Sequence, residues 1–400
     1  MNKRIFPFTA HGTVKAPRSK SLAHRLIIGA GLSYGESTVT GVEKSEDVLA
    51  TLDCIKALGV DVSLSGNVLK IKRGNIPCGI PMLACRESGS TLRFFMPVAL
   101  ALRGEAVFTG TKRLIERGVG IYNELFNEKG ISIETGDEYV KVKGKLCAGS
   151  YKIRGDVSSQ FVTGLLFALP LLSEDSTLEL IPPVESRSYI DITLGALEKL
   201  GVKIAKTDEN SFFIKGGQSF SSGSYDVEGD WSNAAFLYGF NLLGGDVTVE
   251  GLDARSLQGD KACLACFDAL SRGETVDLSD SPDLAPVLFA LAAYSGRGSF
   301  VGTKRLAIKE SDRALAMKNE LEKFGARVDV YENAVEIFSS GLKKPEEPIC
   351  SHNDHRIVMA LTLLLSVTGG EIEGIEAVNK SFPDFFEKLD ELGAITENVN

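Results

Sequence analysis

The sequence predicts an α/β protein of two similar domains, each with three parallel helices buried at its centre. Length is the first observation: 400 residues are too many for one ordinary hydrophobic core and suit about two domains. The second is a unit of strand, polar loop and amphipathic helix that occurs six times along the chain. The third is a set of six helices that are apolar on nearly all sides, which a folded protein must bury.

The repeated unit accounts for the strands and the outer helices. Each copy starts with a short alternating strand and continues through a polar loop into an amphipathic helix. Most copies then pass through a glycine into another strand. The six copies begin at Ser37, Glu105, Ser176, Gly245, Gly298 and Gly370.

The buried helices lie between these copies. Each apolar helix follows a loop of small or polar residues and ends near glycine. Six such helices predict two bundles of three, and each bundle needs sheets and outer helices around it. The six segments read SKSLAHRLIIGAGLSYG, ESGSTLRFFMPVALALRG, SSQFVTGLLFALPLLS, DWSNAAFLYGFNLLGG, SPDLAPVLFALAAYSGRG and NDHRIVMALTLLLSVTGG.

The composition is typical of a globular chain and argues against some classes of function. Hydrophobic residues make up 44% and charged residues 24% of the chain. The net charge of −9 argues against a general nucleic-acid binder, which would be basic. Seven cysteines without disulfide-like spacing indicate reduced thiols and therefore a cytoplasmic protein.

Two further features predict neither a metal site nor a membrane partner. Cys263 and Cys266 form a CxxC in a helical pattern, but no second Cys/His pair follows, so we expect no zinc site there. The start of the chain contains no long apolar run, and the apolar run at 361–367 is too short to span a bilayer. We therefore expect no signal peptide and no membrane span.

The loops before the buried helices are suited to anions. In ESGSTLRFF, residues 87–95, Gly89, Ser90 and Thr91 precede the apolar run of a helix, and Arg93 adds a positive charge. A helix N-terminus has free N–H groups and the positive end of the helix dipole, so it attracts anions. Three such ends aimed at one place would add their fields. We therefore expect these loops together to bind a polyanion.

Charged and hydrogen-bonding side chains recur in these loops, although the chain as a whole is acidic. Taken singly, Asp283 could be a helix-capping acid, Glu310 and Arg313 a solvated helix pair, and His355 a structural histidine. Their joint placement favours a shared anion site. The candidates are Lys20, Ser21, Arg25, Gly89, Ser90, Arg93, Ser158, Ser159, Gln160, Asp283, His355 and Arg356, with Arg117, Ser186, Arg187, Tyr189, Lys309, Glu310, Arg313 and Lys380 from the loops of the repeated unit.

Ten short motifs occur in the order KSLAHR, SGSTLR, ERGVG, SSQF, SRSYIDIT, SLQGD, PDLAP, KESDR, NDHR and NKSFPDFFEKL. With them the chain resembles the 5-enolpyruvylshikimate-3-phosphate synthases over essentially its whole length. The resemblance implies two domains of three βαβαββ-type units each, an inside-out α/β barrel. Domain one would comprise residues 1–14 and 228–400, and domain two residues 15–227, with the active site in the cleft between them.

The resemblance also implies a reaction of the shikimate pathway, which leads to chorismate and the aromatic amino acids. In this 3-phosphoshikimate 1-carboxyvinyltransferase reaction, the 5-hydroxyl group of shikimate 3-phosphate adds to C2 of phosphoenolpyruvate. Phosphate then leaves from a tetrahedral intermediate. Neither a redox step nor a carbanion is needed, so we expect no organic cofactor and no metal. The implied partners are these two small molecules, and we expect a monomer.

The resemblance assigns roles to individual residues. Asp283 would take the hydroxyl proton, Glu310 would give a proton to the methylene carbon, and Lys20 and Lys309 complete the catalytic set. Shikimate 3-phosphate would be bound by Lys20, Ser21, Arg25, Ser158, Ser159, Gln160, Ser186, Tyr189, Asp283 and Lys309. Phosphoenolpyruvate would be bound by Lys20, Gly89, Arg117, Gln160, Arg313, Arg356 and Lys380, with Asp47, Arg93 and His355 in support.

The chain departs from the family pattern at a few positions and leaves rival interpretations. Glu87 stands where many members have Asn, Ser90 and Phe94 replace the usual Thr and Pro, and Arg305 stands where some members have Asn. One rival is the enolpyruvyl transferase that acts on UDP-N-acetylglucosamine, but the TKRLIERGVG region lacks the Cys typical of that enzyme. A non-catalytic binding protein would lack the acid or the base. An RNA-end-processing enzyme on a related repeat would be more basic.

Overall fold

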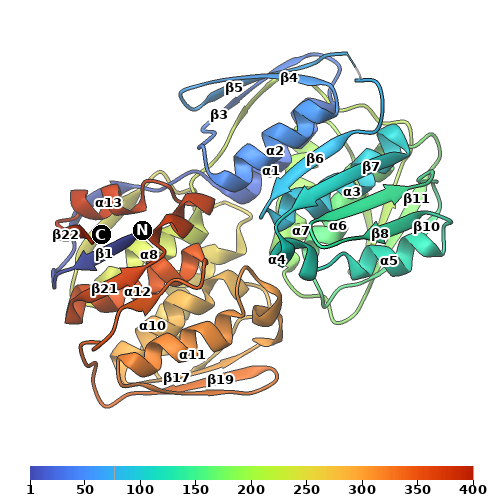
Figure 1. Cartoon of the computed structure of the whole chain (residues 1–400). Coiled ribbons are helices and arrows are strands. Elements are labelled where there is room, and N and C mark those ends of the chain that lie inside the picture. Colours follow the sequence, from blue (N-terminus) through green and yellow to red (C-terminus); the bar gives the residue numbers. More distant parts are fainter. Residues whose placement is uncertain (76, 400) are drawn as a thin grey trace. The chain divides into compact units, whose positions relative to one another are not determined.

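The structure, a computed structural model, describes residues 1–75 and 77–399 (Figure 1). The chain forms two compact units: a continuous unit, Arg18–Glu228, and a discontinuous unit, Met1–Pro17 with Gly229–Asn400. The boundaries predicted from the sequence, after residues 14 and 227, lie slightly earlier. The first of them would cut β2 (His11–Lys15), which pairs in parallel with β15 (Asp246–Glu250) inside the discontinuous unit.

The continuous unit repeats one arrangement three times. Each repeat has a parallel strand pair joined to an antiparallel hairpin, in the orders β14-β3-β5-β4, β6-β7-β9-β8 and β10-β11-β13-β12. The strands are β3 (Glu36–Thr40), β4 (Val60–Ser65), β5 (Val68–Arg73), β6 (Met82–Arg86), β7 (Glu105–Gly110), β8 (Ser132–Thr135), β9 (Tyr139–Lys143), β10 (Ser150–Arg154), β11 (Ser176–Ile181), β12 (Ile204–Asp208), β13 (Ser211–Ile214) and β14 (Ser224–Asp226). The helices are α1 (Lys20–Leu32), α2 (Glu46–Ala57), α3 (Gly89–Arg103), α4 (Lys112–Glu116), α5 (Gly120–Asn127), α6 (Ser159–Ala168) and α7 (Arg187–Lys199), with the 3-10 turn η1 (Leu169–Leu171).

The discontinuous unit contains two complete repeats and one abbreviated one. The complete sheets have the orders β16-β17-β19-β18 and β20-β21-β1-β22, whereas β15 pairs only with β2. The strands are β1 (Asn2–Ile5), β2, β15, β16 (Thr275–Asp277), β17 (Arg297–Val301), β18 (Arg327–Val330), β19 (Ala334–Phe338), β20 (Ile349–Cys350), β21 (Gly370–Glu373) and β22 (Thr396–Val399). The helices are α8 (Trp231–Leu242), α9 (Cys263–Ser271), α10 (Ala285–Ser295), α11 (Arg313–Lys323), α12 (His355–Thr368) and α13 (Phe385–Glu391), with the 3-10 turns η2 (Gly259–Ala262), η3 (Pro282–Leu284), η4 (Lys304–Ile308) and η5 (Ile375–Lys380).

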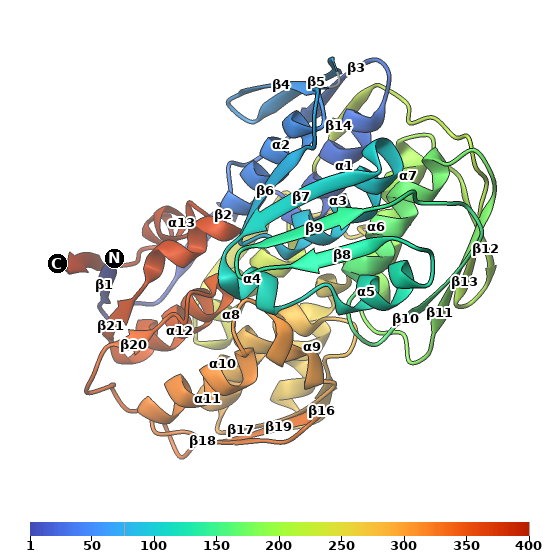
Figure 2. The ribbon, with the colours of Figure 1, turned by 45° about the vertical axis from the view of Figure 1, so that its right-hand side comes forward.

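The abbreviated repeat corrects the expectation of three complete βαβαββ units in this part of the chain. The segment between the end of α9 and the start of β16 is too short to hold a hairpin. The predicted α/β class and the repeated βα organisation are confirmed. Figure 2 shows the sheet β6-β7-β9-β8 laid over α3 in the continuous unit.

The apolar helices are buried as their composition predicts. In α10 every residue from Ala285 to Ala293 is buried, and in α12 every residue from His355 to Ser366 is. The helices α8, α10 and α12 pack on one another, and α3 packs on α6. Such helices have no polar face to offer to water, so they form the centre of each unit.

Small polar residues cap the N-termini of these buried helices, next to the loops that precede them. Five of these helices have an N-cap residue whose side chain accepts a hydrogen bond from a main-chain N–H. These residues are Ser19 in α1, Ser88 in α3, Ser158 in α6, Asp230 in α8 and Asp354 in α12. The loop residues predicted to bind anions therefore lie at helix N-termini. Within residues 1–75 and 77–399, no helix is long and apolar enough to cross a membrane.

Candidate active site

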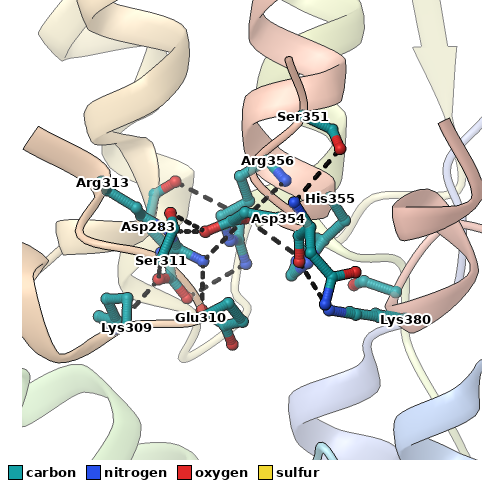
Figure 3. A network of polar contacts seen from close by, with 12 residues as sticks. Asp283, Lys309, Glu310, Ser311, Arg313, Ser351, Asp354, His355, Arg356 and Lys380 are labelled. Carbon is teal, nitrogen blue, oxygen red and sulfur yellow. Dashed lines mark hydrogen bonds and ion pairs between the residues drawn. The ribbon is translucent and has the colours of Figure 1, made fainter. Parts of the chain in front are cut away.

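Arg313 is the centre of a buried group of charges in the discontinuous unit (Figure 3). It begins α11, and its side chain is 1% exposed. Nη1 donates to Asp283 Oδ1 at 2.6 Å, Nη2 to Glu310 Oε2 at 2.7 Å, and Nε to Asp354 Oδ2 at 2.9 Å. Burial lowers the pKa of Arg313, but the charges of Asp354, Glu310 and Asp283 outweigh burial and raise that pKa well above its usual value. The Glu310–Arg313 contact is therefore a partly buried ion pair rather than a solvated one, with Arg313 buried and Glu310 21% exposed.

Asp283 binds two more cations besides Arg313. It lies in η3, immediately before α10. Lys309 Nζ donates to Asp283 Oδ1 at 3.2 Å, and Arg356 Nη2 donates to Oδ2 at 3.1 Å. Three positive side chains thus converge on the Asp283 carboxylate. This side chain therefore has ion-pair contacts that a simple helix-capping acid does not need. A carboxylate held between several cations in a partly buried place is typical of a functional site.

The same surroundings change the proton affinity of Lys309 and Asp260. Burial lowers the pKa of Lys309, although the charge of Asp283 acts in the opposite direction. Burial, and next the charge of Asp283, raise the pKa of Asp260 to about 6. Asp260 hydrogen-bonds to Ser232, whose Oγ also accepts from Arg356 Nη1 at 2.7 Å. The charged group therefore extends from Arg313 through Asp283 and Arg356 to Asp260.

Three residues of this group were not predicted as site residues: Asp354, Asp260 and Ser232. Asp354 is fully buried, and it caps α12 by accepting from Arg356 N at 3.0 Å. The motifs NDHR and SLQGD contain the two aspartates, so a sequence signal was present. What could have identified them is the position of an acidic residue directly before or within the first turn of a helix.

The NDHR segment before and at the start of α12 also contains His355, and Lys380 contacts it. His355 is buried, with Nδ1 3.8 Å from Asp354 Oδ1. Lys380 Nζ donates to the main-chain oxygen of Asn353 at 2.6 Å. Lys380 thereby contacts the short segment 353–355, which contains Asp354 and lies next to the group centred on Arg313.

In the continuous unit, Gly89 and Arg117 lie directly against each other. A Cβ atom at Gly89 would be 3.1 Å from Arg117 Nη2, so glycine leaves room for this guanidinium. Arg93 Nη2 donates to the main-chain oxygens of Arg117 and Gly118, both at 3.2 Å, and Nη1 donates to Gln160 Oε1 at 2.5 Å. Arg93 thus joins α3 both to Gln160 in the first turn of α6 and to the Arg117 segment.

Arg25 connects a second set of predicted residues. Its Nη1 donates to the main-chain oxygen of Ser21 at 2.6 Å, and Nη2 donates to that of Tyr189 at 3.0 Å. Its Nε donates to Thr193 Oγ1 at 2.8 Å. Burial lowers the pKa of Arg25 to about 9, while the charge of Tyr189 acts to raise it. Arg25 is therefore a buried arginine that holds α1 against α7.

The other predicted residues of this unit lie at helix starts. Lys20 Nζ donates to Asp47 Oδ2 at 2.9 Å, which joins α1 to α2. Ser158 caps α6 just before Ser159, and Ser186 precedes α7 with φ at 53°. Arg187 binds the main-chain oxygen of Glu209 at 2.7 Å.

The chain is similar to known proteins over nearly its whole length. The family described as EPSP synthase (3-phosphoshikimate 1-carboxyvinyltransferase) matches residues 9–269 and 266–389. A protein from Clostridium kluyveri named 3-phosphoshikimate 1-carboxyvinyltransferase is 42% identical in an alignment that covers 97% of this chain and 96% of that protein. The chain belongs to the EPSP synthase family.

Further matches agree with this assignment. A protein of the same name from Clostridium perfringens is 38% identical and covers 98% of this chain and 98% of its own length. A solved structure of EPSP synthase from Acinetobacter baumannii has a TM-score of 0.79, with 23% identity over 99% of this chain and 100% of that one. At this identity the likeness to the EPSP synthase structure concerns the fold.

The positions that depart from the EPSP synthase pattern have structural partners. Phe94 is buried, and the Arg25 guanidinium lies 5.2 Å from its ring centroid. Arg305 is buried, and its Nη2 donates to the main-chain oxygen of Ser279 at 2.6 Å. Both side chains therefore pack within their own units.

In residues 1–75 and 77–399, no group of three or more His, Cys, Asp or Glu side chains could hold a metal ion.

Proposed function

We propose that the chain transfers the enolpyruvyl group of phosphoenolpyruvate to the 5-hydroxyl group of shikimate 3-phosphate and releases phosphate. The observation that carries this proposal is the arrangement of Asp283 and Glu310 on neighbouring nitrogen atoms of Arg313. The reaction needs a proton acceptor at the hydroxyl oxygen and a proton donor at the methylene carbon. One buried guanidinium holds both carboxyl groups at close range: Asp283 accepts as a carboxylate, and Glu310 donates once it has left Arg313 and bound a proton.

The proposed chemistry has two steps. In the addition step, Glu310 gives a proton to the methylene carbon, the 5-oxygen bonds to C2, and Asp283 accepts the hydroxyl proton. In the elimination step, the new methyl group returns a proton to the Glu310 carboxylate, the bond between C2 and the phosphate oxygen breaks, and phosphate leaves. Positive charge develops at C2 during protonation, so carboxylates nearby stabilise the transition state.

Substrate binding must rearrange the group of charges around Arg313. Three nitrogen atoms of this guanidinium already bind carboxylates, so a substrate anion has to compete with them. Glu310 belongs to the loop before α11, and its side chain is 21% exposed, whereas Asp354 is fully buried. We expect the anion to displace Glu310 from Arg313, which leaves this carboxyl group able to turn toward the substrate.

Residues of both units would bind the two substrates. Two highly charged anions share a site only where several cations offset their repulsion. We assign phosphoenolpyruvate to Lys20, Gly89, Arg117, Gln160, Arg313, Arg356 and Lys380. We assign shikimate 3-phosphate to Lys20, Ser21, Arg25, Ser158, Ser159, Gln160, Ser186, Tyr189, Asp283 and Lys309. The cytoplasmic location and the monomeric state stay predictions from the sequence.

Phosphate release with two acceptors tests the proposal. With phosphoenolpyruvate present, shikimate 3-phosphate should support turnover and UDP-N-acetylglucosamine should not. Turnover with UDP-N-acetylglucosamine alone would favour the other enolpyruvyl transferase. Binding of both substrates without any phosphate release would favour a non-catalytic binding protein, although the acid and the base are both present.

A further inference from the structure

The turn before α12 contains two consecutive residues in left-handed backbone conformations. His352 has φ at 50° and Asn353 has φ at 54°. Residues with a Cβ adopt this region at a cost, and such conformations persist only where surrounding contacts hold them. The turn provides the main-chain oxygen that Lys380 binds, and it leads into Asp354 and Arg356. Its shape therefore decides where several charged side chains of the proposed site lie.

Glu320 holds this turn from α11. Its side chain is 3% exposed. Oε2 accepts from Cys350 N at 2.9 Å, and Oε1 lies 2.8 Å from His352 Nε2. Lys323 Nζ is 2.8 Å from Oε2. Burial raises the pKa of Glu320, but the bonds from His352, Lys323 and Cys350 outweigh burial and lower that pKa, so the group is a carboxylate.

One helix fixes the turn at both ends. Glu320 lies two helical turns after Arg313 on α11, so the two side chains project from the same side of the helix. Arg313 binds Asp354 after the turn, at 2.9 Å from Nε to Oδ2, while Glu320 binds Cys350 and His352 before and within it. Between these points Asn353 N donates to Ser351 Oγ at 3.2 Å.

We propose that Glu320, acting through His352, is a positioning residue for phosphoenolpyruvate binding. It stabilises the left-handed turn at residues 352–353 and thereby places Lys380, Asp354 and Arg356. This inference rests on the proposed function and extends it to a residue that has no assigned substrate contact. If the turn relaxes in part of the molecules, the apparent affinity falls by the fraction that stays competent.

Steady-state kinetics of Glu320→Ala and His352→Asn test the proposal, with each substrate varied in turn. Asparagine tolerates the left-handed region, so His352→Asn removes the imidazole contact and keeps the backbone preference. Both variants should raise KM for phosphoenolpyruvate about tenfold and leave KM for shikimate 3-phosphate within about twofold. Glu320→Gln keeps an acceptor for Cys350 N and should lie between the wild type and Glu320→Ala. Glu322→Ala is the matched control, because Glu322 is exposed on the same helix and pairs with Lys318.

The double variant Glu320→Ala with His352→Asn shows whether Glu320 and His352 act through one contact. Its effect on KM for phosphoenolpyruvate should equal the larger single effect, and a product of the two effects would overturn the shared role. Equal increases in both KM values, or none in either folded variant, would overturn the proposal. If Glu320→Ala does not fold, the KM values of His352→Asn test the proposal, because His352 is only half-buried. A wild type that releases no phosphate would instead refute the proposed function, and this inference with it.

Discussion

Replacing Asp260 by asparagine should remove a loss of stability that the wild type suffers as the pH rises. Asp260 is 4% exposed, and burial, followed by the charge of Asp283, raises its pKa from 3.8 to about 6. The charge of Arg356 and the hydrogen bond to Ser232 act to lower it. Because the folded pKa is the higher one, the folded state binds this proton more tightly than the unfolded chain does.

The sign and the size of the effect follow from these two values. The contribution of Asp260 to stability is fully present below its unfolded pKa, and it is lost as the pH rises through about 6. A difference of about two pKa units corresponds to about 3 kcal/mol. An asparagine at this position does not titrate, so the variant lacks this loss.

Urea denaturation of the wild type and of Asp260→Asn at about pH 4 and about pH 8 measures the effect. The free energy of unfolding of the variant, relative to the wild type, should rise by about 2 kcal/mol between these pH values, because the unfolded carboxyl is already partly ionised at about pH 4. Asp268→Asn is the control, because Asp268 is exposed on the neighbouring helix α9. This control should follow the wild type. Parallel pH dependence of Asp260→Asn and the wild type would refute the reasoning.

Four further predictions concern single residues. Arg117→Ala should raise KM for phosphoenolpyruvate about 10- to 150-fold and KM for shikimate 3-phosphate much less, because a charge-assisted bond contributes about 1.5 to 3 kcal/mol. Arg25→Ala should show the opposite preference, and equal losses for both substrates in the two variants would contradict the assignment. Gly89→Ala places a Cβ 3.1 Å from Arg117 Nη2, so KM for phosphoenolpyruvate should rise while the melting temperature stays unchanged. Arg86→Ala should unfold at a lower urea concentration than Arg86→Gly, because φ at 54° costs a residue with a Cβ about 1 kcal/mol; identical midpoints would contradict this.

The helices were predictable from the sequence because burial leaves a strong local pattern. A run such as 285–293, apolar on every side, has no stable place except the interior, and α10 lies there. The abbreviated repeat beside β15 was not predicted. Its missing hairpin becomes clear only when β15 is seen to pair with β2 alone, a strand far away in the chain.

The candidate residues were predictable, but their contacts were not. Asp283, Glu310 and Arg313 stood out as charged residues in polar loops. The Arg313 guanidinium binds Asp283, Glu310 and also Asp354. These contacts depend on how α10, α11 and α12 pack, which the spacing of residues along the sequence does not encode. Asp260 was missed for the same reason, since its proximity to Asp283 arises because η2 and η3 both pack on α8.

In the proposed mechanism, Glu310 donates a proton to the methylene carbon while Asp283 accepts one from the hydroxyl group. The most direct measurement is the rate at which solvent deuterium enters the methylene group of phosphoenolpyruvate, followed by NMR with shikimate 3-phosphate present. In Glu310→Gln, a nearly isosteric change, this rate and kcat should both fall by about 10² or more, while substrate binding stays within about tenfold. Normal exchange and normal turnover in Glu310→Gln would contradict the account and would make Lys309, which also binds Asp283, the next candidate donor.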